Sequence, residues 1–413
     1  MSDLLVGGHM ECAVHFRTTN EDGSVREQGG KAMVGDELAL RGNDGSKINR
    51  PFEEMKRISD LEGEITIDLL DGDTLQITNA GPKHDELRRA LMKGRNAVMW
   101  KDRLIDERKV LSTFRCSYEL KAGPSVLKGT GDVMLYDRSL IFSPDDGSLF
   151  RVWLVKIKKI ERTQDRLLLH HRLGSFELFD ISLGLDALAD AVQRTYAALR
   201  KETEALVQEI YPQISSGASV KAAEVLMDGR AALKNEITII DPRFWTVLEN
   251  RLTTSELGSK FKFLSATTKG LGRVGVMKDG RTGKVGLWFL VPMRLTDPGD
   301  IKVIAFDSQD EERGQATLLF SFDSMAEFLG HDNETAVIEA LAESLRSSGF
   351  RREIISLSEY DLSMPENSRY QKAINAMPEL AALRDAYIGK ADHDDMWASS
   401  VRKVINELEE NED

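Results

Sequence analysis

The glycines near the middle of the chain form the motif that comes closest to known chemistry. Residues 269–275, KGLGRVG, contain the pattern G-x-G-x-x-G, which cradles phosphates where a strand precedes the glycines and a helix follows them. The next residues, VMKDGRTGKVG, contain three more glycines and cannot form a stable helix. A kinase-type glycine flap would tolerate a hairpin here, but no HRD or DFG sequence follows. We therefore expect hairpin turns between strands.

The same stretch is strongly basic, although the chain has a formal net charge of −13 at pH 7. Between Gly258 and Gly286 the only carboxylate is Asp279. Positive charge on glycine-rich loops suits phosphates, nucleic acid or an acidic protein surface, while a solvated loop that only improves solubility has the same composition. The candidate anion- or partner-binding residues are Lys260, Lys262, Lys269, Arg273, Lys278, Arg281 and Lys284.

The histidines and aromatic residues give weaker signals. His170 and His171 alternate along one expected strand and so point to opposite faces, whereas His393 lies in an acidic first turn of the last helix. Trp288 and Phe289 are consecutive in an expected strand, so one of them should face the core and the other should be exposed beside the basic loop, with Trp245 as a third aromatic of interest.

Sequence motifs of catalysis are missing. The chain contains no G-x-S-x-G, H-E-x-x-H, Walker A or EF-hand pattern. We therefore expect no catalytic residue, no metal and no cofactor. A non-enzymatic protein is the prediction, with the question left open for residues 220–357.

Composition indicates an ordinary globular protein of two to four domains. The chain has 413 residues, of which 41% are hydrophobic and 30% are charged. No apolar run is long enough to cross a membrane and the first residues do not form a secretory leader, which predicts a cytoplasmic protein. Cys12 and Cys116 lie at equivalent places in two expected first strands, where we expect them to be buried thiols rather than a disulfide or a zinc site.

Two segments of about 100 residues repeat one pattern of short strands followed by an amphipathic helix. Residues 10–107 and 108–212 are the two copies, and their turns and apolar positions are offset by 102 residues, or by 101 in the helices. The matched features are Asp44-Gly45 and Asp146-Gly147, Lys56-Arg57-Ile58 and Lys158-Lys159-Ile160, Leu38 and Leu140, Leu40 and Phe142, Gly72 and Gly174, Leu87 and Leu188, and Leu91 and Val192.

The rest of the chain reads as a third domain and a tail. QISSGAS near residue 215 is the expected linker. Residues 220–357 are expected to form an α+β domain that carries the basic glycine-rich loop, with EITIID and KFKFLSAT among its strands. Residues 358–413 are expected to be a helical region.

About seven antiparallel strands closed by one helix resemble the pleckstrin-homology-like (PH-like) superfold. In layout, the tandem copies are also similar to archaeal taxis adaptors of the CheF type and to the middle domain of FACT histone chaperones. The predicted fold class is thus α+β: two tandem PH-like barrels or sandwiches, a third α+β domain and a helical tail. The resemblance implies an adaptor that binds partner proteins.

Two alternatives stay open at this point. One is a nucleic-acid or chromatin-associated protein that uses the basic loop 260–284. The other is an adaptor on an anionic membrane surface. Phosphoinositide binding is disfavoured, because the hairpin from Thr18 to Gly30 carries Glu21, Asp22 and Glu27 against Arg26 alone. The oligomeric state is left open.

Overall fold

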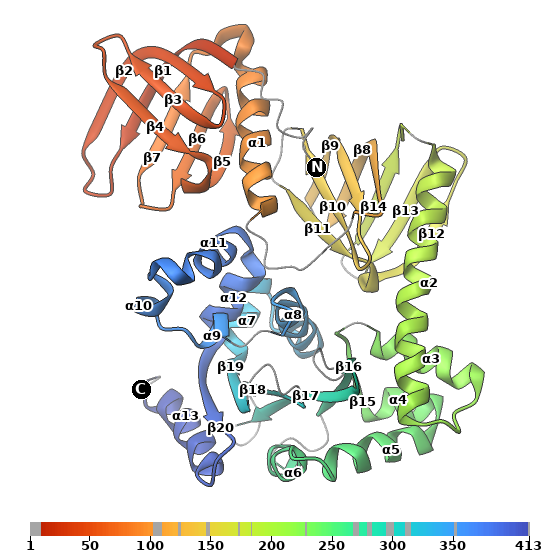
Figure 1. Ribbon diagram of the computed structural model, residues 1–413. Helices are drawn as coiled ribbons and strands as arrows, with labels where there is room; N and C mark the ends of the chain where they lie inside the picture. Colours follow the sequence, from red (N-terminus) through yellow and green to blue (C-terminus); the bar gives the residue numbers. More distant parts are fainter. Residues whose placement is uncertain are drawn as a thin grey trace. The chain divides into compact units, whose positions relative to one another are not determined.

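A computed structural model describes residues 10–101, 110–122, 125–145, 149–171, 174–182, 184–227, 229–266, 272–278, 283–294, 301–309, 315–350 and 353–411. The fold is α+β, with two curled antiparallel sheets, a third sheet and several helices (Figure 1). The chain divides into two compact units, Met1–Arg194 and Thr195–Asp413. The division falls within one long helix, α2 (Leu185–Ile210).

The first sheet has seven antiparallel strands in the order β4-β3-β2-β1-β7-β6-β5. Alternate residues of β1 are buried, as expected for a strand with one face on the core. Leu87 and Leu91 of helix α1 (His84–Lys101) belong to the same buried cluster as the sheet. The strands are β1 (Met10–Thr19), β2 (Val25–Val34), β3 (Glu37–Gly42), β4 (Lys47–Pro51), β5 (Met55–Leu61), β6 (Glu64–Leu69) and β7 (Thr74–Thr78).

The second sheet repeats this order as β11-β10-β9-β8-β14-β13-β12. The repeat predicted from sequence is therefore present as two sheets of one topology. Even an irregularity is repeated, because the strand register shifts between Met55 and Arg57 and again between Ile157 and Lys159. The strands are β8 (Ser112–Ala122), β9 (Ser125–Leu135), β10 (Ser139–Pro144), β11 (Phe150–Trp153), β12 (Ile157–Arg162), β13 (Arg166–His171) and β14 (Gly174–Phe179).

A glycine lets two strands approach closely in each sheet. A Cβ at Gly30 would lie 2.2 Å from the Arg41 carbonyl oxygen, and a Cβ at Gly131 would lie 2.5 Å from that of Ser143. Such distances exclude any other residue unless the backbone moves. These glycines occupy matching places on β2 and β9 and so permit the same local bend in both copies.

Helix α1 also contacts the second sheet, within the same unit. The Asn96 side chain donates to the Pro144 carbonyl oxygen (3.5 Å) and accepts from the Leu149 backbone N–H (2.8 Å). Met99 of α1 packs on a small buried cluster that includes Ile141. One helix therefore packs into the core of the first copy and against the outer face of the second sheet.

The second unit contains a six-stranded antiparallel sheet in the order β15-β16-β17-β18-β19-β20. Its apolar residues are buried on both faces, because α7, α8 and α12 cover one face and α5, α6 and α13 pack on the other (Figure 1). The strands are β15 (Ala231–Leu233), β16 (Arg273–Lys278), β17 (Val285–Arg294), β18 (Ile301–Ser308), β19 (Ala316–Ser321) and β20 (Tyr387–Asp392).

The helices of the described part of this unit precede, interrupt and follow the sheet. They are α3 (Ser216–Leu226), α4 (Lys234–Ile240), α5 (Pro242–Thr253), α6 (Gly258–Ala266), α7 (Phe322–Leu329), α8 (Glu334–Ser347), α9 (Glu353–Ser356), α10 (Glu359–Leu362), α11 (Ser368–Ala376), α12 (Pro378–Ala386) and α13 (Trp397–Asn411).

Two strand predictions in this unit are wrong, since EITIID and KFKFLSAT form helices α4 and α6. Short apolar runs do not distinguish strand from helix, and in α6 the buried residues Phe261 and Leu264 are three apart, which is helical spacing. The expected helical region at 358–413 also contains β20, which pairs with β19.

Smaller corrections concern the linker and the repeat. The expected linker QISSGAS contains the N-cap of α3, Ser215, whose hydroxyl accepts from the Ala218 N–H. Gly72 lies in a hairpin turn at positive φ, whereas Gly174 begins β14 and is not its counterpart. Cys12 and Cys116 face the same side of their strands, but they are not at equivalent positions. The residue of the second copy that corresponds to Cys12 is Phe114, two residues before Cys116. Asp146-Gly147 lies outside the described residues.

Candidate functional site

The structure describes five of the seven candidate cations and separates them into three groups. Lys260 and Lys262 lie on α6, and Lys278 and Lys284 are exposed on either side of the β16–β17 connection. Arg273 is in strand β16. Lys269 and Arg281 lie outside the described residues.

Arg273 does not belong to a surface site. Its residue is only 4% exposed, and it pairs with Leu233 on one side and Leu290 on the other within the sheet. Its guanidinium Nη2 donates to the Thr335 hydroxyl at 3.5 Å. The prediction that Arg273 contacts an anionic partner at the surface is therefore wrong, because the strand places its side chain inside the unit.

The last glycine of the G-x-G-x-x-G pattern has a packing role. A Cβ at Gly275 would lie 2.1 Å from the Trp288 ring on the neighbouring strand. Gly275 is in β16, which pairs directly with β17 without an intervening helix. Gly275 lies in a strand, as expected, and not at the helix N-terminus that the pyrophosphate of a nucleotide would need. The described element before this strand is helix α6 and not the expected strand.

The expected exposed aromatic beside the basic loop is absent. Trp288 and Phe289 are both 0% exposed, because the third sheet has helices on both faces. The Trp288 ring lies 5.3 Å from Phe350, and the Phe289 ring lies 5.3 Å from Phe261 of α6. Trp245 is also buried. These three residues therefore offer no platform on which a base could stack.

Helices α5 and α6 form a tight corner. A Cβ at Gly258, the first residue of α6, would lie 2.1 Å from the Thr253 carbonyl oxygen that ends α5. The Arg251 guanidinium donates to the Val285 carbonyl oxygen (3.1 Å), which ties α5 to the sheet. These contacts fix the angle at which the two helices meet.

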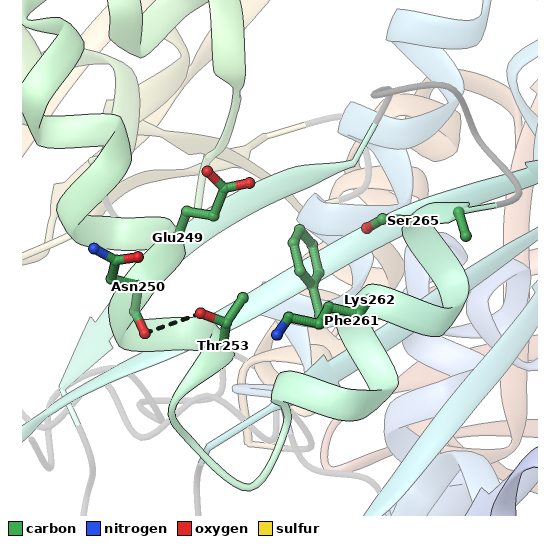
Figure 2. Close-up of a pocket in the computed structure, with 7 residues that line it drawn as sticks. Glu249, Asn250, Thr253, Phe261, Lys262 and Ser265 are labelled. Atoms are coloured by element: carbon green, nitrogen blue, oxygen red, sulfur yellow. Dashed lines mark hydrogen bonds between the residues drawn. The ribbon is translucent and has the colours of Figure 1, made fainter.

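An open depression of about 450 Å³ lies in this corner (Figure 2). Residues of α5 face residues of α6 across it, as Figure 2 shows. The side chains of Glu249, Asn250 and Lys262 form no hydrogen bond or ion pair with any other described residue. The lining residues are Glu249, Asn250, Thr253, Phe261, Lys262, Ser265 and Ala266.

Lys260 belongs to a different arrangement on the other side of α6. Its ammonium nitrogen lies 5.8 Å from the Trp397 ring centre, and the Phe263 and Trp397 rings are 5.4 Å apart. The Arg402 guanidinium lies 5.4 Å from the Phe263 ring. These cation–π contacts hold α13 against α6. Lys260 and Lys262 are thus on one helix but in different surroundings.

The prediction that His170 and His171 point to opposite faces of one strand is confirmed, whereas the prediction for His393 is wrong. His170 lies 3.2 Å from Glu161, while His171 lies on the opposite face beside Phe176. His393 does not simply belong to an exposed acidic turn, because its Nε2 lies 2.8 Å from the Oδ2 of Asp307 in β18.

Asp307 is the centre of a buried polar network that the sequence does not reveal. It is fully buried, and it accepts hydrogen bonds from the Ser308 N–H (2.8 Å) and the Thr317 hydroxyl (2.6 Å). The Trp397 indole N–H donates to the same hydroxyl (2.8 Å). Buried polar groups are normally satisfied by hydrogen bonds, so packing alone accounts for this network. The network connects β18, β19 and α13. Its Asp307–His393 and Thr317–Trp397 contacts join residues that are 86 and 80 positions apart in the sequence.

The free edges of the two copies are alike. Strands β5 and β12 each end the strand order of their sheet, and each begins with the register shift and two exposed cations, Lys56-Arg57 and Lys158-Lys159. Lys159 pairs with Glu161. Lys56, Arg57 and Lys158 form no ion pair with another described residue. An edge strand offers unpaired backbone N–H and C=O groups for an added strand.

An ion pair ties each edge strand to the start of the following helix, with the charges reversed. Asp60 of β5 lies 3.0 Å from the His84 ring nitrogen and 3.5 Å from the Arg88 guanidinium of α1. At the matching place in the second copy, Arg162 of β12 pairs with Asp186 of α2. The strand position is the same in both copies, but the sign is reversed and the helix position differs, because Asp186 corresponds to Asp85 at the helix offset of 101.

Both cysteines are free and buried. Burial raises the pKa of Cys116 from 9.0 to about 12, and burial also raises the pKa of Cys12. Such thiols are protonated near neutral pH and are poor nucleophiles. Within the described ranges, no three His, Cys, Asp or Glu side chains are grouped as metal ligands. Among the helices of the described ranges, none is long and apolar enough to cross a bilayer.

Comparison with known proteins gives no family. No protein-family model matches the chain, and no curated protein matches it. One solved structure that resembles part of it is the crystal structure of the C-terminal domain of an unknown protein from Leishmania infantum. That match has a TM-score of 0.19 and 15% sequence identity, and it covers 22% of this chain and 84% of the other.

Proposed function

We propose that the chain is a non-enzymatic interaction protein that binds partner proteins through two PH-like copies, each closed by its helix. The observation that carries the proposal is the repetition of the same free strand edge, with its register shift and its pair of exposed cations, in β5 and β12. Buried residues keep a fold stable in any protein, but an exposed edge that is repeated in detail suits recognition.

An extended partner segment would add as a further strand to either edge. Its backbone would pair with the unpaired groups of β5 or β12, and its acidic side chains would meet Lys56-Arg57 or Lys158-Lys159. Main-chain pairing supplies affinity, and the exposed cations supply a preference for acidic sequence. We expect a cytoplasmic location for this activity.

The nucleic-acid alternative has less support. It needs the basic loop to act as one surface, whereas Arg273 is buried and Trp288 and Phe289 are covered. Lys262, Lys278 and Lys284 are exposed in the described part of the chain. The membrane alternative rests on charge alone, and co-sedimentation with anionic liposomes tests it.

Selection of displayed peptides against the immobilised full-length chain tests the proposal. We expect enrichment of extended, proline-poor peptides with acidic residues. The double substitution K158E/K159E or K56E/R57E should lower the affinity of such a peptide by roughly three- to tenfold, since exposed ion pairs contribute about 0.2–1 kcal/mol each and the reversed charges repel an acidic peptide.

A matched control changes the same charge elsewhere. Lys201 and Lys221 are exposed, and neither forms an ion pair with another described residue. K201E/K221E should therefore leave peptide affinity unchanged. Equal loss in the control variant would show a general charge effect. Enrichment of basic peptides, or binding of an oligonucleotide that is lost in K260E/K262E, would contradict the proposal.

A further inference from the structure

The depression between α5 and α6 presents two opposite charges without internal partners. Glu249 is half-buried on α5, and Lys262 is exposed on α6. They do not form an ion pair with each other or with another described residue. Elsewhere in the molecule, facing charges on neighbouring elements do pair, as Asp60 does with Arg88.

The α5 side of the depression suits a cation. Glu249 and Asn250 lie in the last turns of α5, which ends at Thr253. The C-terminal end of a helix carries a partial negative charge, and the Glu249 carboxylate adds a full one. The Asn250 side-chain oxygen adds an acceptor that no described residue uses. A ligand ammonium group is therefore favoured on this side.

The α6 side suits an anion and an apolar group. The Lys262 ammonium carries the positive charge there. Phe261 lines the depression with its ring held against Phe289. A ligand carboxylate would pair with Lys262, and an aliphatic group would contact the Phe261 ring.

From this arrangement we infer a binding site for a small zwitterion that carries both an ammonium and a carboxylate group, such as a free amino acid with an aliphatic side chain. A volume of about 450 Å³ accommodates a molecule of that size. The site is open and polar, so binding is weak, in the range of about 0.1–10 mM. This inference is independent of the strand edges, which lie in the other unit.

Calorimetric titration of the full-length chain with three probes tests the site. L-Leucine carries both charges, 4-methylpentanoate lacks the ammonium group and 3-methylbutylamine lacks the carboxylate. We expect saturable binding of L-leucine and binding about tenfold weaker for each of the other two, since a charge-assisted hydrogen bond contributes about one such factor.

Two substitutions test the acidic α5 side and the basic α6 side of the depression separately. E249Q should weaken the binding of L-leucine about tenfold and should remove the difference in affinity between L-leucine and 4-methylpentanoate. K262M should also weaken the binding of L-leucine about tenfold and should remove the difference in affinity between L-leucine and 3-methylbutylamine. K260M is the matched control, because Lys260 is on the same helix but stacks on Trp397. It should leave binding unchanged. Absence of saturable binding, equal binding of all three probes, or equal loss in K260M and K262M would overturn the inference.

Discussion

The two seven-stranded sheets share their strand order but differ at the end of the β1–β2 and β8–β9 hairpins. In the first copy, Thr18 pairs across the hairpin with Arg26, whose guanidinium meets Asp44 at 2.7 Å. In the second copy, the corresponding pair is Leu120 and Leu127, and Leu127 is 55% exposed. One end is polar and internally paired, whereas the other presents apolar side chains to solvent.

The outer faces differ as well. Ile141 and Met134 of the second sheet are buried in the cluster that Met99 of α1 joins. Their counterparts in the first sheet are Ala39 and Met33, which are only partly buried. The two copies therefore have similar buried interiors and similar edge strands, whereas their exposed surfaces differ. If both edges bind extended segments as proposed, we expect the two copies to differ in the side chains that they prefer. The following experiments test which features of packing and charge the two copies share.

The largest effect is expected where α1 meets the first sheet. A Cβ at Gly94 would lie 2.1 Å from the Phe52 ring, so G94A should destabilise the chain by about 1–3 kcal/mol through overpacking. The second copy has the smaller Leu154 and the larger Thr195 at the corresponding positions. F52L should therefore restore most of the stability of G94A. Urea denaturation of the single and double variants measures this, and the absence of rescue would argue against equivalent packing in the two copies.

An effect of similar size is expected at the contact that Asn96 of the first helix makes. N96A removes two hydrogen bonds and leaves the Leu149 N–H without a side-chain acceptor, which should cost about 1–3 kcal/mol. The second helix has Ala197 at the corresponding position, so the substitution makes α1 more like α2. Hydrogen exchange of the Leu149 amide should become faster. The exposed Asn20 provides the control as N20A, and equal effects of the two would contradict the role of Asn96.

The cysteines should give the copies different alkaline stability. The pKa of Cys116 is raised to about 12, so the folded state keeps its proton while the unfolded thiol ionises near 9.0. The contribution of Cys116 is complete below pH 9 and is lost as pH rises toward 12, by at most about 1.4 kcal/mol per pH unit. C116A should therefore flatten the alkaline decline of the unfolding free energy more than C12A does. Equal slopes in both variants would contradict this difference.

The reversed ion pairs should have the smallest effect, because both side chains of the second pair are largely exposed. R162E should destabilise the chain by about 0.5 kcal/mol, and D186K should reverse the loss. The difference should vanish in about 1 M salt, where charges are screened within roughly 3 Å. A loss that persists in salt would show that Arg162 acts through packing rather than charge.

Local spacing was sufficient to predict that one pattern of strands occurs twice, in two sheets of the same strand order. Leu38 and Leu140, or Leu87 and Leu188, keep their offset because each is fully buried in the same place of the same topology. The α+β class also follows from these patterns. Strand order itself is not contained in spacing, and the PH-like identity and the closing role of the helices stay predictions.

The second unit was predicted less well for two physical reasons. Trp288 and Phe289 are both buried because helices cover both faces of the third sheet, and a single strand cannot show how many layers surround it. Counting charges in the sequence predicted Arg273 in a surface patch, but composition does not distinguish a buried arginine from an exposed one. The Asp307–His393 contact joins residues 86 apart, so only the fold brings them together.

Hydrogen exchange along the free strand edges tests the central claim most directly. The full-length chain is compared with and without an acidic peptide obtained by the selection described above. The account predicts slower exchange of backbone amides in β5 or β12, with little change in the interior strands β1 and β8, which already have partners on both sides. Slowing confined to α6 and the β16–β17 strands, or no slowing at either edge in the presence of saturating peptide, would contradict it.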